Sequence, residues 1–193
     1  EGVVAYNNGD GFVGSLTDVS AQGGYWVKVS GDQTLSLGAA EPTQDDGAGG
    51  TSAVVYDLHE GNNLVSFHSI PVDSAISSVF GGVDLLGVIA EGSAAANIDG
   101  QWYGSLDEVD AESGYWVQSN ADGEFVSVCG DPSDDVVYTL HEANNLISYA
   151  YADGQSIGDA LPDDTEEAVY AIVGEGVASI NLNGFPQPSN SPP

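Results

Sequence analysis

The chain has 193 residues and a mass of 19.7 kDa, which suits one ordinary domain or two small ones, and its hydrophobic fraction of 41% is enough for a core. It carries 30 acidic residues against a single basic residue, Lys28, for a formal net charge of -29. This balance excludes a nucleic-acid partner, because phosphate binding requires basic side chains, and no apolar run is long enough to be inserted in a membrane.

Such an acidic surface repels itself, so it suits a saline or extracellular setting in which salt or bound cations screen the charge. The absence of methionine predicts a processed or excised piece of a longer precursor. The single cysteine, Cys129, excludes an internal disulfide bond.

Residues 1–38 are predicted to form short strands separated by tight turns. Asp10-Gly11 is a hairpin signal, and residues 16–19 (LTDV) predict a single helical turn. The segment GYWVKVS that follows reads as a strand whose Tyr25 and Trp26 point to opposite faces of a sheet.

Residues 39–90 contain a Gly-rich linker, two strands and a short helix. The linker is AAEPTQDDGAGGTSA, residues 39–53. The sequence VVYDLHEGNNLVSF, residues 54–67, alternates apolar and polar side chains and predicts two strands with a bend near Gly61. Residues 71–80 (PVDSAISSVF) predict a short helix.

The remainder of the chain repeats these segments. EGSAAANIDGQWYGSL and GYWV return 90 residues after their first copies, and VVYTLHEANNLISY returns 82 residues after its own. A second short helix is predicted at residues 156–164. The chain therefore divides into repeat copy one (1–90), repeat copy two (91–174), a third partial repeat strand (175–184) and a Pro-rich tail (185–193).

These patterns predict an all-β protein of two tandem homologous β-rich modules, sandwich or barrel-like, with short helical insertions. The paired motif, N-L-[VI]-S at residues 63–66 and 145–148 with G-Y-W-V at residues 24–27 and 114–117, resembles a known repeat. It is similar to the "G-W-N-L-I-S … G-Y-W-V" modules of secreted and surface proteins of marine bacteria and of structural proteins of viruses that infect marine bacteria.

The resemblance implies a structural protein and carries no catalytic residues. The Trp that usually precedes the motif Asn is Asn62 in the first copy and Asn144 in the second. If that Trp anchors a core, another side chain must fill its volume here.

In the order that the resemblance implies, a module starts at the NNL strand and ends after GYWV. This chain then holds one continuous module, residues 53–130, and two half-modules, residues 1–38 and 136–184. Half-modules expose unpaired strand edges, so they are expected to close either within one chain or between neighbouring chains. Residues 1–7 (EGVVAYN) and 175–181 (EGVASIN) share one repeat position, so only one of them can fill it in a single module.

Two histidines and several aromatic residues are candidates for chemistry. His59 and His141 each precede a Glu at the same repeat position, which permits a general base or a shared metal site, although duplication favours a structural role. Trp102 and Tyr103 are neighbours that alternate faces, so one of them is a candidate for stacking on a sugar ring. The repeated residues of the GYWV strands, Tyr25, Trp26, Tyr115 and Trp116, are predicted to pack the modules together.

Clustered acidic loops are candidate calcium ligands. Asp131, Asp134 and Asp135 are the chosen set, and calcium is the one cofactor that they suggest. Their spacing does not match an EF-hand loop, and a solvated loop is the favoured interpretation.

Taken together, the sequence predicts a non-enzymatic structural or adhesive repeat protein of an extracellular surface, virion or appendage. Its expected partners are further copies of itself or a larger surface assembly, with no nucleic acid and no membrane insertion. The alternative is a carbohydrate- or calcium-dependent binding module.

Overall fold

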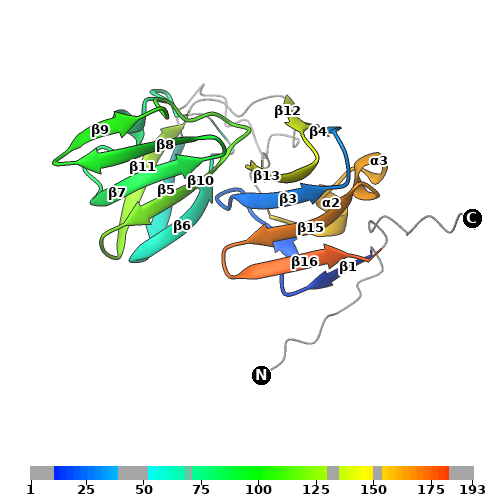
Figure 1. The fold of residues 1–193 in the computed structure, drawn as a ribbon. Helices are drawn as coiled ribbons and strands as arrows, with labels where there is room; N and C mark the ends of the chain where they lie inside the picture. Colours follow the sequence, from blue (N-terminus) through cyan, green and yellow to red (C-terminus); the bar gives the residue numbers. More distant parts are fainter. Residues whose placement is uncertain are drawn as a thin grey trace, which may run out of the picture.

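Alternating apolar residues and frequent glycine turns produce an all-β fold, as predicted. The computed structural model describes residues 11–38, 52–67, 69, 71–129, 135–149 and 154–182. In this part of the chain, short strands form two similar modules that lie side by side (Figure 1).

The first, which we call the continuous module, consists of residues 52–129. Its elements are β5 (Ser52–Leu58), β6 (Gly61–Ser66), α1 (Ile76–Val79), β7 (Leu85–Ala90), β8 (Ser93–Ile98), β9 (Gln101–Gly104), β10 (Gly114–Ser119) and β11 (Gly123–Cys129). The antiparallel sheet β6-β10-β7-β8-β9 forms one layer, and the β5–β11 pair and α1 cover it. Aromatic rings fill the space between them, with Tyr56 stacked on Phe125 at a centroid distance of 4.5 Å.

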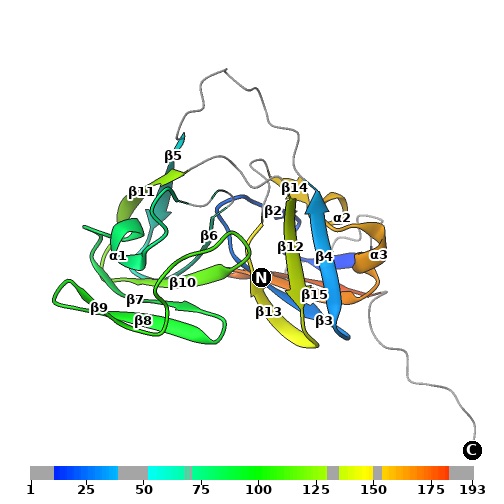
Figure 2. The same cartoon turned by 90° about the horizontal axis from the view of Figure 1, so that it is seen from above.

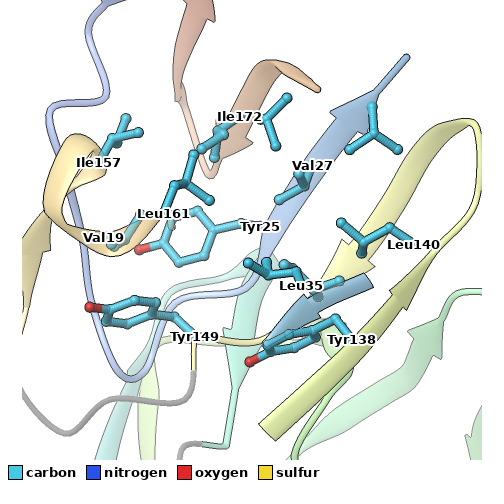
Figure 3. Packing of buried hydrophobic residues seen from close by; sticks show 14 of the residues in the cluster. Val19, Tyr25, Val27, Leu35, Tyr138, Leu140, Tyr149, Ile157, Leu161 and Ile172 are labelled. Atoms are coloured by element: carbon cyan, nitrogen blue, oxygen red, sulfur yellow. The ribbon is translucent and has the colours of Figure 1, made fainter. Parts of the chain in front are cut away.

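The second, which we call the composite module, combines residues 11–38 with residues 135–182. Its elements are β1 (Phe12–Gly14), β2 (Asp18–Val19), β3 (Tyr25–Val29), β4 (Gln33–Gly38), β12 (Asp135–Leu140), β13 (Ala143–Ile147), β14 (Gln155–Ser156), α2 (Ile157–Ala160), α3 (Asp163–Glu166), β15 (Val169–Gly174) and β16 (Val177–Asn181). The sheet β1-β16-β15-β3-β13 lies opposite the β4–β12 pair (Figure 2). Tyr25, Leu35, Tyr138 and Ile157 meet in its core (Figure 3).

The two modules have the same strand pairing. Trp116 of β10 lies opposite Leu64 of β6, and Trp26 of β3 lies opposite Leu146 of β13. The two sequence motifs are therefore neighbouring strands in each module. The half-modules meet within one chain, so each sequence copy contributes strands to both folded modules.

At one place in the composite module, two neighbouring strands pair without a turn that joins them. In the continuous module, β8 and β9 form a hairpin whose turn residues Asp99 and Gly100 have φ angles of 52° and 80°. The equivalent strands β16 and β1 come from opposite ends of the chain and pair directly, with the Leu182 N–H donating to the Gly11 carbonyl at 3.0 Å. The competing segment, residues 1–7, lies outside the described residues.

The helical insertions are shorter than predicted in one place and absent in another. The helix expected over residues 71–80 is formed only by α1, whereas residues 156–164 contain α2 and begin α3. The helical turn expected at residues 16–19 is wrong, because the backbone of Asp18–Val19 pairs with Gln155–Ser156 as strand β2. The two paired residues are 136 and 138 positions away, so the pairing is invisible to local sequence signals.

Candidate functional site

Several residues that recur in both sequence copies gather where the modules meet. We call this region the junction. Residues 22–24 of the composite module pair with the free edge of β6, and residues 112–114 of the continuous module pair with the free edge of β13. The Ser66 N–H donates to the Gln22 carbonyl and the Ser148 N–H to the Glu112 carbonyl, both at 2.9 Å. Each module therefore gives the other the same contact.

Two glutamates connect the modules by bidentate contacts. Glu91, in the β7–β8 turn, pairs with His141 Nε2 at 2.6 Å and accepts the Leu146 N–H at 2.7 Å with its other oxygen. Glu175, in the β15–β16 turn, pairs in the same way with His59 and accepts the Leu64 N–H at 2.7 Å. Each glutamate thus satisfies a ring nitrogen and a backbone donor of the other module.

The motif asparagine fixes the turn that carries each histidine. Asn63 is buried; its Oδ1 accepts the His59 N–H and its Nδ2 donates to the His59 carbonyl, both at 2.9 Å. Asn145 makes the same pair of bonds to His141, at 2.8 Å and 2.9 Å. Because the side-chain amide supplies both a donor and an acceptor, it closes the turn completely.

The motif glycine permits close approach of the modules. A Cβ atom on Gly24 would lie 2.8 Å from the Val65 carbonyl oxygen and 3.0 Å from Leu64 Cδ1. A Cβ atom on Gly114 would lie 2.8 Å from the Ile147 carbonyl oxygen and 2.9 Å from Leu146 Cδ1. Only a residue without a side chain fits at either crossing.

The motif serine completes the junction. Ser66 is fully buried, and its hydroxyl donates to the Gly23 carbonyl of the other module at 2.7 Å. Ser148 is also buried, and its hydroxyl donates to the Ala111 carbonyl of the other module. A buried hydroxyl needs such a partner, so the serine is matched to its position between modules.

The junction raises the pKa of both of its histidines. The hydrogen bond to Glu175 raises the pKa of His59 above its ordinary value. The carbonyl of Glu142, followed by the Glu91 carboxylate, raises the pKa of His141. Both rings are more than half exposed, so solvent screens these pairs and each contributes little stability by itself.

The residues predicted to pack the modules divide into two sets. Tyr25 and Tyr115 lie in the cores of their own modules, where their hydroxyls accept the Ser20 and Asp110 N–H groups at 2.8 Å. Trp26 and Trp116 are half-buried on the opposite faces of the same strands, beside the buried junction leucines Leu146 and Leu64.

The missing motif Trp leaves no hole in either core. Asn62 and Asn144 are exposed and lie opposite Gln118 and Lys28 on the outer faces of the sheets. A larger side chain at these positions would therefore cover the surface of the sheet. The chain's single Lys is also engaged, because Lys28 Nζ lies 5.1 Å from the centre of the Tyr170 ring.

The structure separates the two aromatic residues proposed for sugar stacking. Trp102 is half-buried and packs on the core of the continuous module, where it lines an open depression. Tyr103 is 59% exposed on the other face of β9. Neither this depression nor a small apolar cavity in the composite core has a histidine in its lining.

The candidate calcium ligands are not tested. Asp131 and Asp134 lie outside the described residues, as does the side chain of Asp135. Where the structure describes the chain, no three His, Cys, Asp or Glu side chains gather as they would around a metal ion. In the same part of the chain, no helix is long and apolar enough to cross a membrane.

Sequence reasoning missed the junction glutamates. Glu91 and Glu175 begin two of the repeated Glu-Gly segments, and this recurrence was the available signal for a role. Spacing alone could not connect them to the histidines, because His59 and Glu175 are 116 residues apart. No family model, curated protein or solved structure matches this chain.

Proposed function

We propose that this protein is a non-enzymatic structural or adhesive component of an extracellular surface, virion or appendage, which assembles through strand pairing and module packing. The observation that carries the proposal is the use made of the repeated residues. His59, Leu64 and Ser66, together with their second copies, contact the neighbouring module. Asn63 and Asn145 fix the turns that carry the two histidines. Such use is expected of a protein whose repeats serve to join one another.

Composition and resemblance supply the setting of the proposal. A net charge of -29 keeps separate copies soluble and apart in dilute solution, and salt weakens that repulsion. The similarity to tandem modules of marine surface and viral structural proteins favours the same setting. Closure of the composite module from two chain ends also provides a route to assembly, since the same strand pairings are available to a second copy.

Location tests the proposal directly. Antibodies raised against the purified chain should label the cell surface, an appendage or a released particle in immunogold electron micrographs of the source organism. Labelling confined to the cell interior would contradict the proposal. Pre-immune serum on the same grids is the control.

Assembly between chains is tested by light scattering across protein and salt concentrations. We expect larger species to increase with both, because salt relieves like-charge repulsion between copies. A monomer under all conditions would remove self-assembly from the proposal. Repeating the series and a thermal melt with calcium or EDTA tests the calcium-dependent alternative, which predicts a shift that depends on the cation.

A further inference from the structure

An open depression lies at the end of the continuous module. Three segments form its walls: the loop that follows α1, the β8–β9 turn and the β10–β11 turn. Its volume is about 570 Å³, within the ordinary range for small-molecule sites. Its lining is mixed, with Phe80 and Trp102 beside Asp84, Asn97, Asp99 and Asn120.

The side chains of the depression are held in place before any ligand arrives. Trp102 packs against Phe80 with the ring centroids 6.3 Å apart and the ring planes inclined by 43°. Asn120 Nδ2 donates to Asp84 Oδ1 at 2.7 Å. Asn97 Oδ1 accepts the Gly100 N–H at 3.0 Å, so its Nδ2 group is the part that can donate to a ligand.

In the composite module, a longer loop fills the position that corresponds to the depression. The segment between Leu161 and β15 has seven residues and contains α3, whereas the segment between Phe80 and β7 has four. The Glu166 carbonyl of α3 accepts from Asn181 Nδ2 at 3.0 Å, and Asn181, the counterpart of Asn97, is buried.

The aromatic residue beside the loop is also more buried in the composite module than in the continuous module. Phe12, the counterpart of Trp102, is 3% exposed, whereas Trp102 is half-buried. The ends of the two loops correspond, because the Asn120 N–H donates to the Asp84 carbonyl as the Ser30 N–H does to the Ala168 carbonyl, both at 3.0 Å. The open depression is thus specific to one of two otherwise similar modules.

We propose that this depression binds a neutral saccharide, with Trp102 as the stacking platform. An indole face suits the apolar C–H face of a pyranose, and side-chain amides and carboxylates match its hydroxyls, which both donate and accept. The net charge of -29 and the carboxylates of Asp84 and Asp99 disfavour sulfated or uronic-acid glycans.

A quaternary ammonium ligand is less well matched. Such ligands favour a cage of several aromatic faces. Here Phe80 supports Trp102, and the Asp84 carboxylate is hydrogen-bonded to Asn120. The depression therefore offers one aromatic wall rather than a cage.

The test uses the full chain on an array of neutral, sulfated and uronic-acid oligosaccharides, followed by titration calorimetry with the neutral glycan that gives the strongest signal. We expect Trp102→Phe, which copies the residue of the closed module, to weaken binding by about tenfold, because the stacking face shrinks. Tyr103→Ala, on the opposite face of the strand, should leave the affinity unchanged. Thermal melts of both variants establish that they are folded.

A loop graft provides a second variant. Replacing residues 81–84 with the sequence of residues 162–168 should fill the depression and abolish binding while keeping Trp102. No binding of any neutral glycan, a preference for anionic glycans or for choline, or equal affinity of wild type and Trp102→Phe would overturn the inference. Because the depression shares no residue with the junction, this inference and the proposed structural function can fail independently.

Discussion

Ala143 occupies the position at which the first copy has Gly61, and both residues have positive φ angles, 87° and 107°. In this region an alanine Cβ crowds the following carbonyl, whereas glycine has no such contact. The second copy therefore carries backbone strain that the first copy avoids. The rest of the turn is the same, since Asn63 and Asn145 make equivalent hydrogen bonds.

This difference gives a reciprocal prediction. Ala143→Gly should raise the free energy of unfolding by about 1 kcal/mol, because it removes the strain of the positive φ angle. Gly61→Ala should lower it by a similar amount. Urea denaturation followed by tryptophan fluorescence measures both, and a destabilised Ala143→Gly variant would show that the alanine methyl group makes a compensating contact.

The histidine pairs predict a specific pH dependence. Because the junction raises the pKa of His59 and His141, it binds the protonated rings more tightly than the unfolded chain does. This stabilisation is complete below the unfolded value of about 6.5 and is lost as the pH rises through the higher folded pKa.

Comparison with a variant that cannot titrate at these positions isolates the effect. The urea midpoint of wild type should exceed that of His59→Gln/His141→Gln by more at about pH 5.5 than at about pH 8.5. Titration of the carboxylates changes the stability of both proteins, so its effect cancels when the urea midpoint of the variant is subtracted from that of wild type. An equal difference at the two pH values would mean that the pairs do not couple to stability.

At the scale of elements, the motif strands were predictable because their alternation and turns are local. The GYWV and NNL segments form β3, β10, β6 and β13 as expected. The strand at Asp18–Val19 was not predictable, because its pairing partner, Gln155–Ser156, lies in the other half of the chain. The junction itself depends on contacts of the same long range, so its glutamates escaped local analysis.

Strand segments approach closely at the junction, so a methyl group added there should lower stability more than one added at an open position. Two glycine variants test this prediction. Gly24→Ala places a methyl group 2.8 Å from a backbone carbonyl, so it should destabilise the fold by about 1–3 kcal/mol. Gly31→Ala, whose Cβ would have no heavy atom within 4 Å, should have little effect. The urea midpoints of the two variants measure this difference. Equal midpoints would mean that the junction relaxes to accept the methyl group.

At the scale of the whole molecule, the composite module is completed by strands from both ends of the chain. β16 and β1 lie where the continuous module has a two-residue hairpin turn. Leu182 and Gly11 are already hydrogen-bonded there, at 3.0 Å. The composite module therefore has the same strand pairing as the continuous module, although its β16 and β1 strands are not joined by a turn.

A circular permutant tests this separation. Joining Leu182 to Gly11 through Asp-Gly, which copies Asp99-Gly100, and opening the chain within residues 39–51 should preserve the fold. The melting temperature should equal or exceed that of the original chain, because closing β16 onto β1 now brings together near neighbours. A Pro-Pro joint, which cannot adopt positive φ angles, is the control and should be less stable. Failure of the Asp-Gly permutant to fold would show that the present chain ends are required.

The sequence by itself determined the all-β class and the duplication, because periodicity and repetition are properties of the chain alone, and the resemblance implied the phase shift between repeats and modules. It also limited the half-modules to two ways of closing. Only the tertiary structure decided that they close within one chain, that Glu91 and Glu175 contact the histidines, and that one depression is open while its counterpart is filled. Those outcomes depend on residues brought together from distant parts of the chain, and on a three-residue difference in loop length whose effect appears only when the loop packs.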